Sequence, residues 1–157
     1  MCRLEIKLVM RLFHLCSIVL CVLLLQSCYE KESFTNSTSA RLSFSIDTLK
    51  FDTIFSNVGS TTHQFIVYNR NNDAVRTSVS LQSKYYRLNV DGIASNDIRN
   101  LEIRGNDSAF VFVEVTVDPK DSDSPILVFD SILFETNGNQ QDVKLEAFGQ
   151  NVHLYNE

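Results

Sequence analysis

The sequence predicts an all-β protein: an antiparallel β-sandwich of about seven to nine strands, preceded by a signal-peptide helix. Two observations lead to this prediction. From Arg41 onward, apolar residues recur at every second position, which is the period of a strand with one buried face. The alternating segments are separated by turn residues at intervals of roughly 8–12 residues, and no long stretch has the helical period.

The first predicted strands alternate between apolar and polar residues. They cover 42–46, 49–55, 62–69 and 75–81. The last two are separated by Asn71, Asn72 and Asp73. Because Asn and Asp side chains bond their own backbone and tolerate left-handed geometry, this triplet predicts a turn.

The later strands are expected at 86–90, 98–103, 109–117, 126–136 and 142–149. The run 109–117 is apolar on both faces at its start, which is typical of a central strand. The dipeptide Asn137-Gly138 is the strongest short-range hairpin signal. We therefore expect the last two strands to form a hairpin.

The cysteines are distributed unevenly. The chain has 157 residues, and all four cysteines fall within the first 28: Cys2, Cys16, Cys21 and Cys28. The remainder therefore holds neither a disulfide framework nor a thiolate metal site. A basic stretch precedes the apolar run 12–25, which is shorter than the ~20 residues of a membrane-spanning helix. This arrangement indicates a signal peptide, which begins at Met1 or at Met10.

The signal segment ends in Leu25-Gln26-Ser27-Cys28. This sequence resembles the lipobox of bacterial lipoproteins. The resemblance implies cleavage before Cys28, followed by acylation of the sulfur and of the new terminal amine. Two alternatives are an uncleaved anchor helix and an ordinary secretory signal. Cleavage would remove three basic residues and one acidic residue, which takes the formal net charge from −5 to −7.

The chain accordingly divides into a signal peptide (1–27), a flexible tether (28–40), a sandwich (41–151) and a short tail (152–157). The tether is assigned from small polar residues over 33–40. The acidic residues directly after Cys28 resemble the export signal of Bacteroidota-type outer-membrane lipoproteins. That resemblance implies a bacterial outer-membrane location, at the cell surface in preference to the periplasmic face.

Several segments carry a further resemblance. They are Val58–Thr61, Phe65–Asn69, Asn106–Ser108, Val113–Pro119, Ile132–Phe134, Thr136-Asn137 and Val143–Gly149. In this order they resemble the immunoglobulin-like domain of the abnormal-spindle and hydin type, and the amino-terminal domain of certain Bacteroidota lipoproteins. The resemblance implies an immunoglobulin-like sandwich that serves as a structural or interaction module, without catalytic residues.

The chemistry-bearing residues form no catalytic set. There is no Gly-x-Ser-x-Gly motif and no glycine-rich phosphate loop, so we expect a protein that is not an enzyme. His63 and His153 lack partners at metal-ligand spacing, and we interpret them as structural residues. No segment is basic enough for a nucleic-acid partner. We expect no cofactor and no metal apart from the covalent lipid at Cys28.

Two weaker candidate sites remain. Tyr85 and Tyr86 adjoin a predicted strand, so at most one faces inward and the other can contact a ligand. Three carboxylates, Asp118, Asp121 and Asp123, share a polar loop and are candidate Ca²⁺ ligands. The alternative for this loop is a solvated turn, because the spacing of a calcium loop is absent.

An Asp-Ser/Thr-apolar pattern occurs four times. It places candidate O-glycosylation sites at Thr48, Thr53, Ser108 and Ser131. The pattern resembles the acceptor of the general O-glycosylation system of Bacteroidota. The alternative is that these pairs form side-chain turns at strand edges.

Two functions remain open. The favoured one is a lipid-anchored envelope protein without catalytic activity, acting as a structural or protein-interaction module toward an unknown partner. The alternative is a cell-surface carbohydrate-binding or adhesin-type module that uses the tyrosine pair and the 118–125 loop.

Overall fold

A computed structural model describes Arg11 and residues 13–17, 32–55, 62–116 and 126–150. The chain separates into two compact units, Met1–Lys31 and Glu32–Glu157. In the first unit, Arg11 and residues 13–17 are helical. Within the described residues, no helix is both long and apolar enough to cross a membrane.

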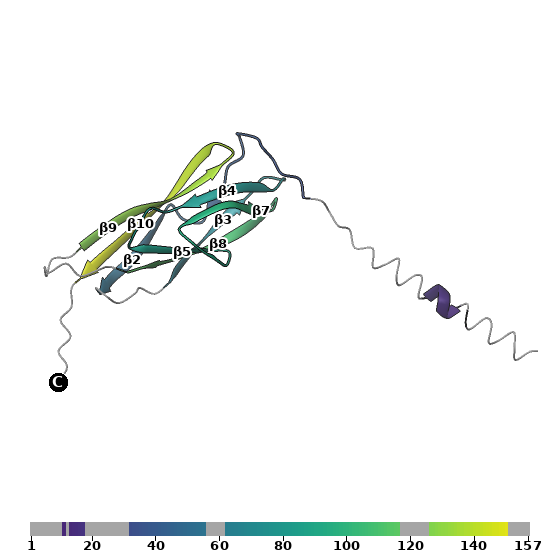
Figure 1. The fold of residues 1–157 in the computed structure, drawn as a ribbon, viewed down its shortest axis with the longest axis horizontal. Helices are drawn as coiled ribbons and strands as arrows, with labels where there is room; N and C mark the ends of the chain where they lie inside the picture. Colours follow the sequence, from purple (N-terminus) through teal and green to yellow (C-terminus); the bar gives the residue numbers. More distant parts are fainter. Residues whose placement is uncertain (1–10, 12, 18–31, 56–61, 117–125, 151–157) are drawn as a thin grey trace, which may run out of the picture. The chain divides into compact units, whose positions relative to one another are not determined.

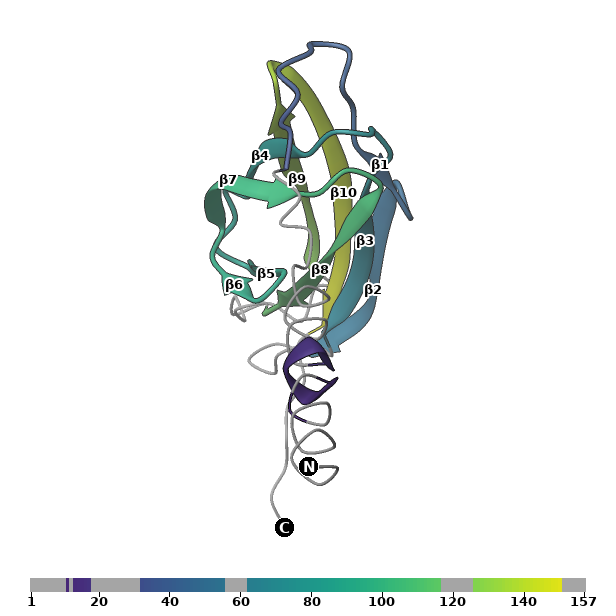
Figure 2. The ribbon, with the colours of Figure 1, turned by 90° about the vertical axis from the view of Figure 1, so that its right-hand side faces the viewer.

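The second unit is an all-β sandwich (Figures 1 and 2). Its described strands are β1 (Ser43–Phe44), β2 (Thr48–Phe55), β3 (His63–Asn69), β4 (Val75–Ser80), β5 (Tyr86–Val90), β6 (Ile93–Ala94), β7 (Asp97–Ile103), β8 (Asp107–Val115), β9 (Ile126–Thr136) and β10 (Asn139–Gln150). One sheet has the order β1-β3-β8-β5-β6, and the other has the order β2-β10-β9-β4-β7. The predicted fold class is therefore confirmed. β1 falls within the expected strand 42–46, and β6, of only two residues, has no counterpart among the expected strands.

The core lies between the two sheets and is built by strand alternation. Val111, Val113 and Val115 of β8 are fully buried, as are Ile132 and Phe134 of β9. The rings of Phe65 and Phe134 meet edge to face across the core, with centroids 6.4 Å apart. β8 lies in the middle of its sheet, as predicted. Burial of these apolar faces is the main stabilisation available to the domain.

One pairing differs from the expected antiparallel arrangement. β2 runs parallel to β10, with Leu49 opposite Leu145. The chain pairs first with β3 through β1, and then passes through residues 45–47 into the other sheet as β2. It arrives there in the same direction as β10. Alternation of apolar residues identifies a strand but does not encode the direction of its partner, so the sequence could not predict this pairing.

The hairpin between β9 and β10 forms as predicted. Asn137 and Gly138 both have positive φ, at 50° and 82°. Two successive positive φ values are the mark of a type I′ turn, whose twist matches that of the flanking strands. The turn brings β9 and β10 together over their full length.

Asn69 locks two neighbouring turns together. Its side chain is 1% exposed. The Nδ2 group donates to the carbonyl oxygens of Asp73, Ile103 and Arg104 at 2.9–3.0 Å. The Oδ1 atom accepts from the backbone N–H of Asn71. The β3–β4 and β7–β8 connections are thereby held side by side, with every polar atom of the amide satisfied.

Residues 32–40, hereafter the strap, pack against the same end of the sandwich. Phe34 forms a parallel bridge with Ala74, and the Thr35 N–H donates to the Ala74 carbonyl. The side-chain amide of Asn137 donates to the carbonyl oxygens of Thr35 and Ser37. This differs from the flexible tether that the composition suggested. Composition alone cannot show that the backbone N–H and C=O groups of the strap form hydrogen bonds with Ala74 and Asn137 of the sandwich.

Candidate binding surface

The outer face of the β2-β10-β9-β4-β7 sheet carries exposed apolar side chains. Alternation along β9 turns Val128, Ile132 and Phe134 into the core and leaves Leu127, Phe129 and Leu133 outside, with Phe129 62% exposed. Phe148 of β10 lies directly opposite Leu127 and is also exposed. Large apolar side chains that gather on one face of a soluble domain mark a candidate interaction surface.

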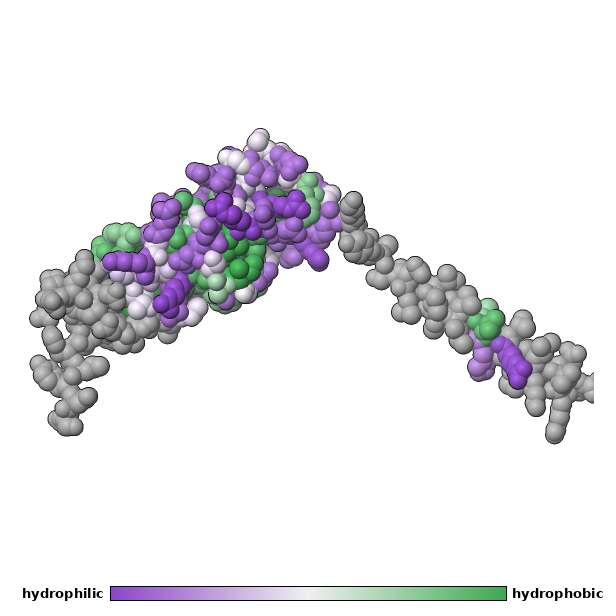
Figure 3. Space-filling view, in the orientation of Figure 1, coloured by the Kyte–Doolittle hydropathy of each residue, from purple (hydrophilic) through white to green (hydrophobic). Residues whose placement is uncertain are grey.

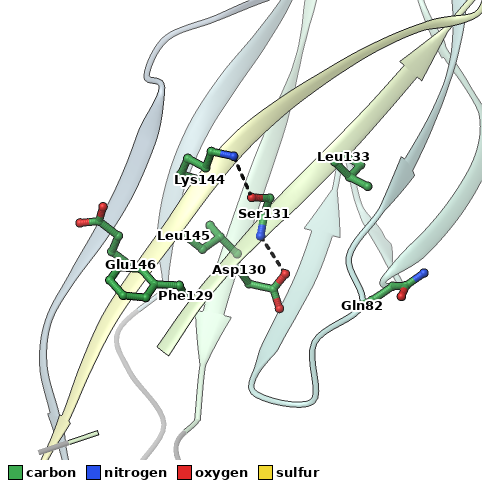
Figure 4. A pocket seen from close by; sticks show the side chains of 8 residues that line it. All are labelled: Gln82, Phe129, Asp130, Ser131, Leu133, Lys144, Leu145 and Glu146. Carbon is green, nitrogen blue, oxygen red and sulfur yellow. Dashed lines mark hydrogen bonds between the residues drawn. The ribbon is translucent and has the colours of Figure 1, made fainter. Parts of the chain in front are cut away.

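A groove of about 720 Å³ crosses this face. Figure 4 shows the residues that line it, which are Gln82, Phe129, Asp130, Ser131, Leu133, Lys144, Leu145 and Glu146. A side hollow of about 380 Å³ adjoins it and shares Gln82, Phe129 and Asp130. The hollow is further lined by Ser83, Lys84, Tyr85, Leu127 and Val128.

The unequal lengths of two strands create the groove. β4 pairs with β9 from Thr77 opposite Thr136 to Ser80 opposite Leu133, and there β4 ends. β9 extends further, over residues 126–132, and the chain after β4 leads through residues 81–85 to β5 in the other sheet. Among the described strands, this half of β9 thus lacks a neighbour on the β4 side, and its outward side chains Leu127 and Phe129 are exposed.

Charged side chains border the groove along β10. The Nζ atom of Lys144 lies 2.5 Å from the Asp142 carboxylate and 3.4 Å from the hydroxyl of Ser131. Glu146 pairs with Lys50 of β2 at 3.1 Å. These pairs are partly solvent-exposed, so each contributes little to stability. They place charges of both signs along one side of the apolar row.

The two candidate tyrosines occupy different environments. Tyr86 is 1% exposed, and its hydroxyl donates to the Val128 carbonyl oxygen at 2.9 Å. Burial raises the pKa of Tyr86, and the negative charges of Asp130 and Glu146 raise this pKa further. Tyr86 is therefore the inward-facing member of the pair, which leaves Tyr85 as the candidate for ligand contact. Tyr85 is half-exposed, lines the side hollow and has Lys84 Nζ 4.8 Å from its ring centroid.

The four Asp-Ser/Thr positions are spread over the sandwich. Thr48 and Thr53 lie in β2, Ser108 in β8 and Ser131 in β9. Only Ser131 lines the groove. In Asp107-Ser108 and Asp130-Ser131, the aspartate Oδ1 accepts the serine N–H at 2.7 Å. This contact is the local side-chain bonding expected as the alternative to glycosylation, and modification at the four positions stays a prediction.

The remaining predicted residues divide into those inside and those outside the described chain. His63 begins β3, and its ring lies 4.6 Å from that of Phe51, so it is a strand residue as expected. Cys28, His153 and the carboxylates Asp118, Asp121 and Asp123 lie outside the described residues. Within the described residues, no three His, Cys, Asp or Glu side chains group as metal ligands would.

A second aromatic pair was not anticipated as a surface feature. Phe110 and Phe112 stack on the outer face of β8, with centroids 6.3 Å apart and an interplanar angle of 22°. Phe110 is 42% exposed. In the sequence, the apolar residues on both faces of 109–117 suggested a central strand. Phe110 and Phe112 are two positions apart in this segment, so they lie on the same face of it. Figure 3 shows that hydrophobic patches interrupt a largely hydrophilic surface on the face in view.

No protein-family model and no curated protein sequence matches the chain. Among solved structures, the chain is similar to the ASH / PapD-like domain of human CEP192. That match has 9% identity and a TM-score of 0.48, and it covers 83% of this chain and 99% of that domain. A protein of unknown function from Porphyromonas gingivalis W83 has 14% identity and a TM-score of 0.47, with coverage of 71% and 47%.

The CooA pilin subunit from enterotoxigenic Escherichia coli is similar at 7% identity and a TM-score of 0.45, with coverage of 71% of this chain and 99% of the pilin. These likenesses concern architecture alone. The fold is therefore described by its own strand order, in which β1 belongs to one sheet and β2 pairs with β10 in the other. From Glu32 onward the described chain is an all-β sandwich of two five-stranded sheets.

Proposed function

We propose that this protein is a lipid-anchored module of the bacterial envelope that binds a protein partner and has no catalytic role. The observation that carries the proposal is the groove. There β9 extends beyond its pairing with β4, and its side chains Leu127, Phe129 and Leu133 are exposed. A strand edge supplies unpaired N–H and C=O groups in a fixed row. An extended segment of a partner can add to such an edge.

The chemistry of the groove favours an extended segment with apolar side chains. Backbone hydrogen bonds to residues 126–132, apart from the Val128 carbonyl that already accepts from the Tyr86 hydroxyl, would provide affinity. Alternate side chains of the partner would lie over Phe129 and Leu133. The ion pairs along β10 would set the register of charged partner residues. The partner is thus a protein segment in extended conformation.

The anchor is proposed from the sequence. The Leu25–Cys28 segment resembles a lipobox, and Cys28 would carry the lipid. Two or more acyl chains, at about 0.8 kcal/mol per buried methylene, hold a protein on a bilayer where one chain does not. We place the protein in the outer membrane, on the cell-surface face in preference to the periplasmic face.

A carbohydrate-binding or adhesin-type function is the second candidate. Tyr85 favours it, because a half-exposed aromatic ring in a hollow beside Phe129 can stack on a sugar. A glycan array separates the two functions. Binding that is lost in Tyr85→Ala would support the carbohydrate function, and the absence of any glycan ligand would contradict it.

Photo-crosslinking in intact cells tests the protein-binding function. A photoreactive amino acid replaces Phe129 in the groove, and the matched control replaces Phe110, an exposed phenylalanine of the other sheet. We expect a discrete protein adduct from position 129 that is absent from position 110. Equal adducts from both positions, or none from position 129, would contradict the proposal.

The anchor has its own test. Labelled palmitate should enter the wild-type chain and be absent from Cys28→Ala. Intact-mass measurement should show an acylated chain that begins at Cys28. Equal incorporation of palmitate into Cys28→Ala would contradict the anchor and leave the groove proposal standing.

A further inference from the structure

The strap is held along its backbone by side-chain amides of the β9–β10 hairpin. Asn137 Nδ2 donates to the carbonyl oxygens of Thr35 and Ser37 at 2.9 and 3.1 Å. Asn139 Nδ2 donates to those of Thr38 and Ala40 at 2.6 and 3.0 Å. Two amide groups therefore satisfy four strap carbonyls. Figures 1 and 2 show the strap beside the tip of this hairpin.

The first part of the strap is held by different contacts. Ala74 exchanges backbone hydrogen bonds with Ser33 and Thr35, at 2.8 and 3.0 Å. The guanidinium carbon of Arg76 lies 3.9 Å from the centroid of the Phe34 ring. Glu32 pairs with Arg104 at 2.8 Å. The strap is thus attached from its first described residue to its last.

We infer that the strap fixes which end of the sandwich faces the lipid bilayer, so that the hairpin end lies against the membrane and the groove faces away from it. This inference rests on the proposed acylation of Cys28. Only three residues separate Cys28 from Glu32 in the sequence. Four extended steps of chain span at most about 14 Å, so the attached end of the strap stays near the lipid.

Whether the sandwich has a fixed orientation on the bilayer depends on the length of the free linker compared with the length of the sandwich. A flexible linker over all of 28–40 would have a root-mean-square reach of about 20 Å and would let either end approach the bilayer. By contrast, Phe129 lies eight residues along β9 from Asn137, or about 26 Å at the rise of a strand. With the strap attached, the groove is held beyond the reach of the short linker.

The hairpin end also has surface groups suited to a lipid surface. Arg41 and Arg70 are exposed there, and Arg104 is exposed beside them but paired with Glu32 of the strap. They are gathered by the Asn69–Asn71 turn, because Asn71 donates to the Arg41 carbonyl and Asn69 to the Arg104 carbonyl. Guanidinium groups near a bilayer are attracted to anionic phosphate headgroups. The partner of this end is therefore a phospholipid surface.

Energy transfer to labelled lipid tests the orientation. With residues 1–27 removed and Cys28 acylated, an engineered cysteine would be the only free thiol of the chain. The acylated protein is labelled at Asn36→Cys in the strap or at Thr62→Cys, an exposed position just before β3. It is then placed on phosphatidylethanolamine and phosphatidylglycerol vesicles that contain an acceptor lipid. We expect strong transfer from position 36 and several-fold weaker transfer from position 62.

Two further chains test the role of the strap. In Asn137→Asp/Asn139→Asp the turn keeps an Asp-Gly sequence, which also forms type I′ turns, and loses all four amide hydrogen bonds. A Gly/Ser insertion of about twelve residues between Lys31 and Glu32 lengthens the linker without changing the sandwich. We expect the difference between the two labels to disappear in the insertion chain, while circular dichroism shows a folded domain. It should persist in the double Asp chain, because the Ala74 backbone hydrogen bonds and the Glu32–Arg104 pair still hold the first part of the strap.

The outcomes separate this inference from the proposed anchor. Vesicle-bound wild-type protein with equal transfer from both positions would overturn the orientation and leave the anchor intact. An unchanged difference in the insertion chain would overturn the role of the short linker. Wild-type protein that fails to float with vesicles would overturn the anchor and the orientation together.

Discussion

The hydroxyl of Tyr86 donates a 2.9 Å hydrogen bond to the carbonyl oxygen of Val128 and so joins the two sheets of the sandwich. Tyr86 belongs to β5, and Val128 belongs to the half of β9 that β4 leaves uncovered. Val128 also lines the side hollow. A buried core residue therefore supports the strand segment that forms the candidate binding surface.

Removal of this hydroxyl should weaken the domain. Tyr86→Phe keeps the ring in the core and leaves the Val128 carbonyl without this donor. We expect the free energy of unfolding to fall by about 1–2 kcal/mol, as for a buried hydrogen bond whose acceptor is left unsatisfied. Urea unfolding measures the change. Tyr85→Phe is the matched control, and an equal loss in both variants would contradict the role assigned to the bond.

Tyr86 should also make the free energy of unfolding depend on pH in the alkaline range. Its pKa in the folded protein is raised by burial and by Asp130 and Glu146, whereas in the unfolded chain it is about 10. The stabilisation is therefore complete below about pH 10 and is lost as the pH rises above it, because the unfolded chain releases the proton first. The stability difference between wild type and Tyr86→Phe should shrink above this pH. A difference that stays constant would contradict the prediction.

The side-chain amide of Asn69 should contribute strongly to the free energy of unfolding, because one small group bonds three carbonyl oxygens. In Asn69→Ala, the carbonyl groups of Asp73, Ile103 and Arg104 lose a common donor. We expect a loss of about 3 kcal/mol, since each buried unsatisfied group costs about 1–3 kcal/mol and water can reach some of them. Chemical denaturation of Asn72→Ala, an exposed neighbour, provides the comparison. A similar small effect in both variants would refute the assignment.

Gly105 is required for the close approach of the same two turns. A Cβ atom at this position would lie 1.9 Å from the Asn72 carbonyl oxygen. Gly105→Ala must therefore move backbone, and we expect a loss of about 2–4 kcal/mol, in the range of severe packing defects. At Gly92 a Cβ meets no atom within 4 Å, and only its positive φ opposes substitution. Thermal unfolding should show a smaller loss for Gly92→Ala; the reverse order would contradict the prediction.

Local patterns in the sequence predicted the strands and the last hairpin because both depend on neighbouring residues. Alternation identified the strands, and Asn137-Gly138 identified the turn. The same alternation indicated that only one of Tyr85 and Tyr86 faces inward. The identity of the buried ring followed from the start of β5 at Tyr86, which places this residue opposite Val115 of β8.

The candidate surface could not be predicted in the same way. The groove exists because β4 ends at Ser80 while β9 continues to Ile126, and lateral overlap between strands has no local signal. The strap depends on the meeting of Thr35 with Asn137, residues that are 102 positions apart. Polar composition over 33–40 is common to flexible linkers and to segments that hydrogen-bond along a surface. Acylation at Cys28 and calcium binding by Asp118, Asp121 and Asp123 stay predictions.

Substitutions in the groove should separate binding from stability. Phe129 and Leu133 are 62% and 44% exposed, so Phe129→Ser and Leu133→Ser should each change the free energy of unfolding by no more than about 0.5 kcal/mol. The protein adduct formed from a photoreactive residue at neighbouring position 127 should nevertheless be lost in both variants. Phe134 lies in the same strand but points into the core, so Phe134→Ala should lower the free energy of unfolding by about 3–5 kcal/mol. This variant is the control for loss of stability. An adduct that persists in both groove variants would show that these side chains do not form the binding surface, because the domain itself would be intact.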